Sequence, residues 1–123
     1  MNYKHEVIFC IVNEGFSDSV MSAAREFGAR GGTVFCARGT ANPDSEKLFG
    51  VYIQPEKEIV MILVESKIKN DILHALYNKV GLNTAGGGIA FALPVSEVIG
   101  IGDKIAPKKE APEKKEDPTE KPE

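Results

Sequence analysis

Features that commit a chain to one particular function are scarce in this sequence of 123 residues. It has no tryptophan, two cysteines, two histidines and a net charge of −3. A charge this small gives no bulk electrostatic field that would attract DNA or RNA. The longest unbroken apolar runs, 7–12 and 59–64, are far shorter than the ~20 residues that span a membrane. Because the N-terminus also lacks the pattern of a signal peptide, we expect a cytoplasmic protein.

Signatures of catalysis are missing as well. The sequence contains no Walker loop and no dinucleotide-binding fingerprint. Cys10 and Cys36 lie in apolar runs without metal-site spacing, so we expect both to be small core residues. His74 lies beside the apolar stripe of a helix, where a flanking residue is expected rather than a catalytic one. These absences predict a protein that is not an enzyme.

The chain contains an internal repeat of one sequence pattern. Each copy has an apolar run, then an amphipathic stretch that stops at a glycine (Gly28, then Gly81), then a second apolar run. Ser17 and Ser66 are expected to cap the two helices. The main strands are expected at 7–12, 33–37, 59–64 and 89–93, with a strand extension at 48–54, a break at 55–57 and a short fifth strand at 98–101. This order predicts an α+β, ferredoxin-like double βαβ sandwich with both helices on one sheet face.

The two central strands are apolar on both sides, which matters for assembly. In 7–12 and 59–64 every position is apolar, so both faces of the sheet present hydrophobic side chains. The helices cover only one of these faces, and the chain offers no further helix. Self-association, with sheets from several subunits packed together, is the expected cover.

The C-terminal part differs in composition from the rest. Residues 105–123 are mostly Lys, Glu, Pro and Ala, with no large apolar residue after Ile105. Such a segment buries too little surface to offset its ordering entropy. We therefore expect a folded domain at 1–104 and a disordered, charged tail at 105–123.

Two glycine-rich loops are the candidates for a binding site. Gly31 and Gly32 precede Thr33, and residues 86–88 are all glycine ahead of the last main strand. Amides of such loops can converge on an anion because no side chain obstructs its approach. The alternative is that both loops are only tight turns between a helix and a strand.

At these loops the chain resembles the PII signalling proteins and their PII-like relatives. The resemblance spans about residues 6–103 and rests on the segments EFGARGGTVFCARGT and GGGIAFALPVSEVIGIGD. It implies a homotrimer with inward-facing sheets and three clefts between subunits that bind adenine nucleotides. The matching ligand positions, with Arg38 as an added contact, are Gly31, Thr33, Arg38, Gly39, Gly86, Gly87 and Gly88.

The resemblance also implies an effector loop from Gly39 to about Pro55 that touches partner proteins, a membrane transporter being one partner class. Its candidate contact residues are Thr40, Asn42, Asp44, Phe49 and Tyr52. Phe49 stands where the family has a modifiable tyrosine, and Tyr52 lies nearby without aligning.

Several charges of the family are replaced here. Ile89 stands where a lysine usually follows the glycine loop, Gly100 and Gly102 stand where two arginines usually lie, and Glu56 replaces a lysine near the loop base. Each charge-assisted bond lost costs about 1.5–3 kcal/mol. A less charged adenine ligand, namely AMP, ADP or a cyclic nucleotide, is therefore expected in preference to Mg-ATP with 2-oxoglutarate.

Two other functions stay open from the sequence. CutA proteins share this architecture, so a structural or metal-tolerance trimer without nucleotide sensing is the main alternative, with His5 and His74 as its available histidines. A small enzyme that slowly hydrolyses a bound nucleotide is the other. Stoichiometric transition metal in the purified protein would favour the first, and turnover abolished by loss of Arg38 and Thr33 would favour the second.

Overall fold

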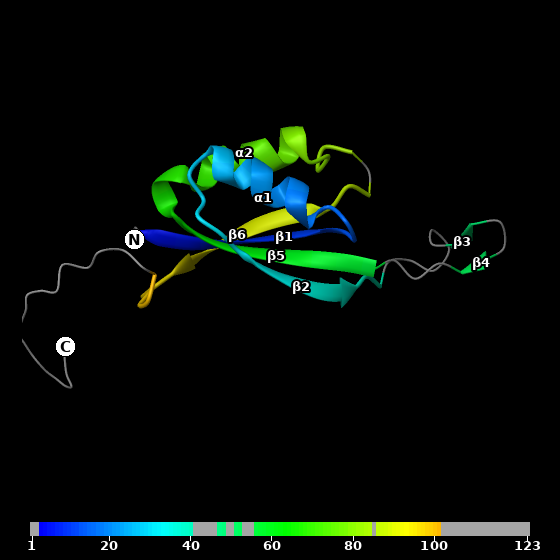
Figure 1. Ribbon diagram of the computed structural model, residues 1–123, viewed down its shortest axis with the longest axis horizontal. Coiled ribbons are helices and arrows are strands. Elements are labelled where there is room, and N and C mark those ends of the chain that lie inside the picture. Colours follow the sequence, from blue (N-terminus) through cyan, green and yellow to red (C-terminus); the bar gives the residue numbers. More distant parts are fainter. Residues whose placement is uncertain (1–2, 41–46, 49–50, 53–55, 85, 102–123) are drawn as a thin grey trace, which may run out of the picture.

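The computed structural model describes residues 3–40, 47–48, 51–52, 56–84 and 86–101 (Figure 1). Two strand–helix–strand units follow one another, as the repeat predicts. Their elements are β1 (His5–Asn13), α1 (Ser17–Glu26), β2 (Thr33–Arg38), β5 (Glu56–Glu65), α2 (Ser66–Lys79) and β6 (Ile89–Val95). Between the units lie two short strands, β3 (Lys47–Leu48) and β4 (Val51–Tyr52). The predicted α+β double βαβ architecture of the chain is confirmed.

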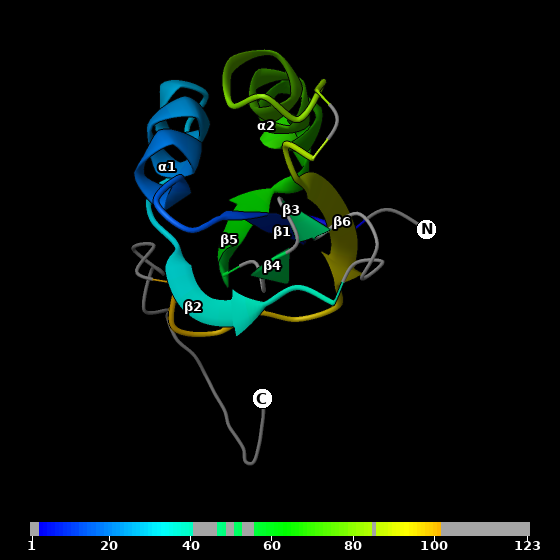
Figure 2. The same cartoon turned by 90° about the vertical axis from the view of Figure 1, so that its right-hand side faces the viewer.

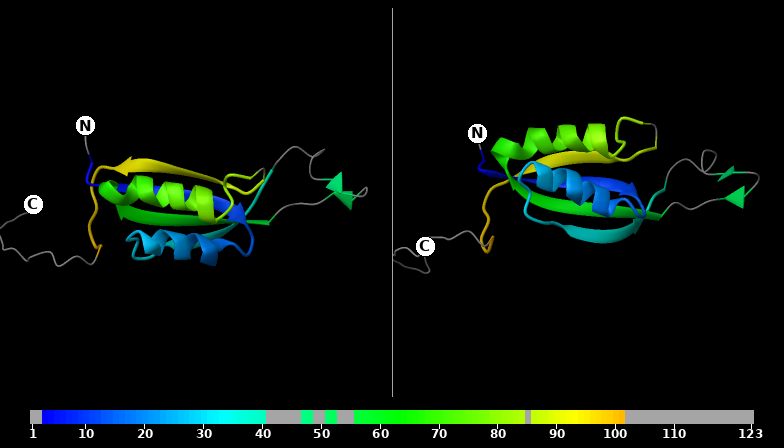
Figure 3. Two further views of the ribbon diagram at one scale, coloured as in Figure 1. Left: turned by 90° about the horizontal axis from the view of Figure 1, so that it is seen from above. Right: turned by 45° about the horizontal axis from the view of Figure 1, so that its top comes forward.

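The main sheet has four strands in the order β2-β5-β1-β6, and every neighbouring pair is antiparallel. Both helices lie side by side over the same face (Figures 2 and 3). The register places Cys10 opposite both Val60 and Ala90, and Val34 opposite Val60. Because side chains alternate along a strand, these residues share the helix-covered face.

The core fills the space between the helices and this face. The sheet contributes alternate positions of β1 and β5, and the helices contribute their apolar stripes. Its largest fully buried side chains are Ile8, Cys10, Val12, Val20, Val60, Ile62, Ile72 and Leu76.

Burial in this apolar layer raises the pKa of the Cys10 thiol to about 11. Cys36, in contrast, is exposed on the edge strand β2, so the prediction that both cysteines are core residues is wrong for Cys36.

The helix starts differ from the prediction too. Neither helix has a side-chain cap from its expected serine, since Phe16 and Glu65 occupy the two N-cap positions. The carboxylate of Glu58 caps the start of α1 instead, because it accepts hydrogen bonds from the amides of Gly15 (3.2 Å) and Ser17 (3.1 Å). The Ser66 hydroxyl instead donates to the Tyr3 carbonyl at 2.6 Å. The second helix is thereby tied to the start of the chain.

Two expected strands also differ. Residues 98–101 form no strand; after β6 they run across the sheet towards β2, and Ile99 is 94% exposed (Figure 2). Of the expected extension at 48–54, only Leu48, Val51 and Tyr52 are described, and they belong to the short strand pair β3 and β4, which is separate from the main sheet. The expected break at 55–57 is partly wrong, because β5 already begins at Glu56. The expected tail at 105–123 lies outside the described residues.

Candidate functional site

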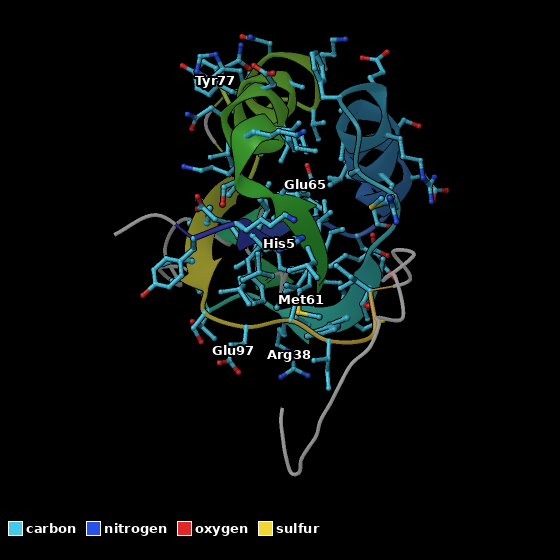
Figure 4. The ribbon with its side chains drawn as sticks, turned by 90° about the vertical axis from the view of Figure 1, so that its left-hand side faces the viewer. His5, Arg38, Met61, Glu65, Tyr77 and Glu97 are labelled. Atoms are coloured by element: carbon cyan, nitrogen blue, oxygen red, sulfur yellow. The ribbon has the colours of Figure 1, made fainter. Side chains whose placement is uncertain are left out.

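One face of the sheet is left uncovered by the helices. Register pairing of β1, β5, β6 and β2 gathers a continuous set of apolar side chains there. The set, named here the open face, comprises Val7, Phe9, Ile11, Phe35, Ile59, Met61, Leu63, Ile89, Phe91 and Leu93. Exposure reaches 59% at Ile89 and 47% at Leu93. Figure 4 places Met61 on the side of the sheet away from both helices.

The glycine loop at 86–88 is tightly built. The Gly87 amide donates to the Thr84 carbonyl at 3.0 Å, and Gly86 and Gly88 have φ of 77° and 123°. A Cβ on Gly87 would lie 1.9 Å from the Gly81 carbonyl oxygen, and one on Gly88 would lie 2.5 Å from the Ile11 carbonyl oxygen. Packing alone therefore explains Gly87 and Gly88. Gly86 differs, since a Cβ there would meet nothing within 4 Å.

The Gly31 loop borders a cavity of about 540 Å³ at the opposite end of the sheet, within the size range of small-molecule sites. It is lined by His5, Gly28, Arg30, Gly31, Leu63, Val64, Glu65, Ile68, Gly100 and Ile101. His5 and Glu65 are directly paired across β1 and β5 at this end (Figure 4). A Cβ on Gly31 would meet nothing within 4 Å, so no contact inside the described chain requires glycine there.

The predicted ligand residues do not meet within one chain. Thr33 starts β2 opposite Met61, whereas Arg38 ends it opposite Glu56, about 17 Å away at strand spacing. The loop at 86–88 leads into β6, which is the other edge of the sheet. With β5 and β1 in between, the two edge strands are about 14 Å apart. One chain therefore offers three separate parts of the predicted site.

The candidate partner residues fall mostly outside the described chain. Thr40 directly follows Gly39 at the end of the described segment, and both come after β2. Tyr52 lies in β4 opposite Lys47. Asn42, Asp44 and Phe49 lie outside the described residues. Their role in partner binding stays a prediction.

Sequence reasoning missed a polar cluster at the end of β1. Lys57 donates a hydrogen bond from Nζ to Oδ1 of Asn13 at 2.7 Å, and Nδ2 of Asn13 lies 3.5 Å from the carbonyl oxygen of Gly86. In the sequence Asn13 reads as a turn residue and Lys57 as part of a break. The available signal was that Asn13 directly follows the apolar run 7–12 and that Lys57 shortly precedes the run 59–64, since antiparallel pairing brings these two positions to the same end of the sheet.

Among the described residues there is neither a cluster of metal ligands nor a membrane-spanning helix. No group of three or more His, Cys, Asp or Glu side chains in that part of the chain is placed to hold a metal ion. None of its helices is long and apolar enough to cross a membrane.

Comparison with known proteins finds likeness among solved structures. No protein-family model matches the sequence, and no curated protein matches it. Among solved structures, PII from Arabidopsis thaliana, crystallised bound to citrate, superposes with a TM-score of 0.59 and 26% identity. The match covers 81% of this chain and 82% of that one. The chain therefore has a PII-like fold.

Proposed function

We propose that this protein is a PII-like signal-transduction regulator that works as a homotrimer. It binds a small anionic effector in clefts between subunits and controls a partner protein through residues 39–55. The single observation that carries the proposal is the open face, an apolar sheet surface that the chain itself does not cover. The likeness to a PII structure supports the regulatory rather than the catalytic assignment.

The energetics favour association of this surface. Burial of one large apolar side chain contributes about 1.5–3 kcal/mol. Ile89, Phe91 and Leu93 are each more than two-fifths exposed, and they form one row along β6. Contiguous apolar patches of this kind are rare on monomers. Packing of several open faces against each other would remove these side chains from water without another protein.

Trimer formation also supplies what one chain lacks. Cyclic assembly brings one patch of a subunit against a different patch of its neighbour. In the proposed trimer, the end of one subunit that carries Gly31 and Thr33 meets the opposite end of the next subunit, where Arg38 and Gly39 follow one edge strand and 86–88 precede the other. The division of these residues between separate parts of the chain supports a site that is completed by a neighbour.

The effector is proposed to be an adenine nucleotide of low charge, namely AMP, ADP or a cyclic nucleotide, in preference to Mg-ATP. The Arabidopsis neighbour carries citrate, so a small polycarboxylate is the second probe. Both ligands share anionic oxygens that loop amides and a few cations can bind. Effector binding selects one conformation of the partner-binding segment, and partner affinity changes with it. The proposed setting is the cytoplasm, with a membrane transporter as the partner class.

Titration calorimetry of the full chain with AMP, ADP, ATP, cyclic AMP and citrate tests this proposal. We expect saturable binding of at least one nucleotide or of citrate, weakened strongly by Gly31→Asp, which adds a carboxylate beside the cavity at a position where a Cβ meets nothing within 4 Å. Ser19→Asp, an equal charge change on the exposed side of α1, is the matched control and should leave binding unchanged. Silence of the wild type towards all five probes at millimolar concentration contradicts the proposal. Stoichiometric transition metal in the same preparation would favour a CutA-like trimer instead.

A further inference from the structure

The cavity beside Gly31 combines an apolar wall with a few ionisable side chains. Its apolar lining residues are Leu63, Val64, Ile68 and Ile101, and its ionisable ones are His5, Arg30 and Glu65. Small-molecule sites commonly bury the body of a ligand against apolar side chains and orient it by a small number of polar groups. The ionisable groups of this cavity therefore determine which ligand charge it accepts.

His5 is held at the cavity by the strand pairing of β1. The register places it directly opposite Glu65 of β5 on one side and Val95 of β6 on the other (Figure 4). Residues directly opposite each other in antiparallel strands share a face, with their Cβ atoms about 4.5–5.5 Å apart. The imidazole therefore has one charged and one apolar neighbour across the sheet.

The imidazole of His5 has no polar partner in the part of the chain that the structure describes. No hydrogen bond or ion pair there involves its ring nitrogens. The carboxylate of Glu65 instead lies 3.3 Å from the ammonium of Lys67. Because each imidazole nitrogen can donate or accept a hydrogen bond, both are open to a molecule that enters the cavity.

The protonation state of His5 sets the net charge of the cavity lining. With a neutral imidazole, the lining carries one positive charge on Arg30 and one negative charge on Glu65. Histidine is the side chain whose charge ordinarily changes between pH 5 and pH 8. Proton uptake by His5 therefore gives a balanced lining one net positive charge, which favours an anionic ligand.

The other charged groups close to His5 in the chain lie elsewhere. The side chain of Glu6 points to the opposite face of the sheet, where its carboxylate lies 3.7 Å from the Lys69 ammonium. Lys4 is exposed ahead of the strand. Glu97, in the segment after β6, lies apart from His5 in Figure 4. Among the described residues, the charge of the cavity therefore depends on the three lining groups alone.

We propose that His5 contacts the effector in this cavity and that its protonation sets the affinity for anionic effectors. This inference rests on the proposed effector-binding function and adds regulation by pH to it. The protonated ring donates a hydrogen bond to an anionic oxygen, which a phosphate of ADP or a carboxylate of citrate supplies. Affinity for the effector therefore rises as the pH falls from 8 to 6.

The first test is calorimetric titration of the full chain with ADP and, separately, with citrate at pH 6, 7 and 8. Proton uptake by the probe itself is common to all variants, so the affinity of the wild type is compared with that of His5→Gln at each pH. We expect this ratio to rise about 5- to 10-fold from pH 8 to pH 6, because a charged hydrogen bond replaces a neutral one. His74→Gln removes the other of the two histidines, exposed on α2, and should keep the response of the wild type.

The second test is proton NMR of the wild type, which does not depend on the folding of a His5 variant. With two histidines in the chain, the imidazole C–H signals form two sets, and loss of one set in His74→Gln assigns both. Addition of the probe that binds should shift the His5 signals and leave those of His74 in place. Thermal unfolding and sedimentation of each variant check folding and assembly.

The outcomes separate this inference from the proposed function. If the wild type binds a probe and the His5 signals do not move, or if folded His5→Gln shows the same pH response as the wild type, the role of His5 is wrong and the proposed function stands. If the wild type binds neither probe at any of the three pH values, the effector function fails and the inference fails with it.

Discussion

The rings of Phe9 and Phe91 stack on the open face, with centroids 5.6 Å apart and an interplanar angle of 27°. The two residues are directly paired across β1 and β6, and Phe91 is 43% exposed. Stacked aromatic pairs contribute about 0.5–1.5 kcal/mol beyond their buried area. The pair joins a central strand to an edge strand in the surface that the proposed trimer buries.

Phe91→Glu is therefore expected to break the assembly. A carboxylate in a closed apolar interface carries a desolvation cost of several kcal/mol, so dissociation to monomers should follow at micromolar concentration. Tyr77→Glu places the same charge at a 55% exposed position on α2, away from the open face, and should leave the assembly intact. Sedimentation velocity distinguishes the two variants. An assembled Phe91→Glu protein would show that the open face is not the interface.

Loss of the Glu58 carboxylate should destabilise the start of α1. Glu58→Ala removes two hydrogen bonds to backbone amides and a negative charge near the positive end of the helix, which predicts a loss of about 1–3 kcal/mol in the free energy of unfolding. Urea denaturation measures this change. Glu14→Ala, a neighbouring exposed acid, should change stability by less than about 0.5 kcal/mol. Equal effects of the two substitutions would contradict the capping role.

Substitution of Gly87 tests whether the turn at 86–88 requires glycine for its packing; it does not test ligand binding. Because even an alanine Cβ would overlap the Gly81 carbonyl oxygen, Gly87→Ala should displace the loop and lower the melting temperature. Gly31→Ala meets no such contact and should leave the melting temperature nearly unchanged. Differential scanning calorimetry of the pair checks this. A Gly87→Ala protein as stable as the wild type would mean that the loop has another accessible conformation.

The buried thiol predicts a loss of stability at alkaline pH. Burial raises the Cys10 pKa from 9.0 to about 11, so the unfolded chain releases this proton at lower pH than the folded one. The thiol's contribution is full below pH 9 and declines as pH rises towards 11, by a few kcal/mol at most. Urea denaturation from pH 8 to pH 11 should show a weaker decline for Cys10→Val. Identical pH profiles of the two proteins would contradict this assignment.

Periodic patterns made the fold predictable from the sequence. Apolar runs at 7–12 and 59–64 and helical stripes that end at Gly28 and Gly81 correspond to β1, β5, α1 and α2. These patterns depend on local spacing, which a single sequence contains in full. The apolar character of both strand faces likewise predicted the open face.

Features set by distant residues were not predictable in the same way. The α1 cap comes from Glu58, which is far away in the sequence, so local rules pointed to Ser17 instead. Burial of Cys10 but not Cys36 depends on strand order, since β2 is an edge and β1 is central. The link from Lys57 through Asn13 to Gly86 also depends on which strands become neighbours.

The candidate site was only partly accessible to sequence reasoning. From composition alone, Gly31 and 86–88 were equally good candidates for a ligand site. The structure distinguishes Gly87, where a Cβ would overlap other atoms, from Gly31 and Gly86, where a Cβ would meet nothing within 4 Å. This difference arises from backbone contacts that no sequence motif records. It also changes the informative test, because a substitution at Gly87 alters the turn whether or not a ligand binds.

Sedimentation equilibrium of the full chain at micromolar concentration tests the central claim most directly. We predict a single species of three times the chain mass, because only shared burial of the open face removes it from water. A stable, folded monomer would contradict both the interface and the intersubunit site that depends on it.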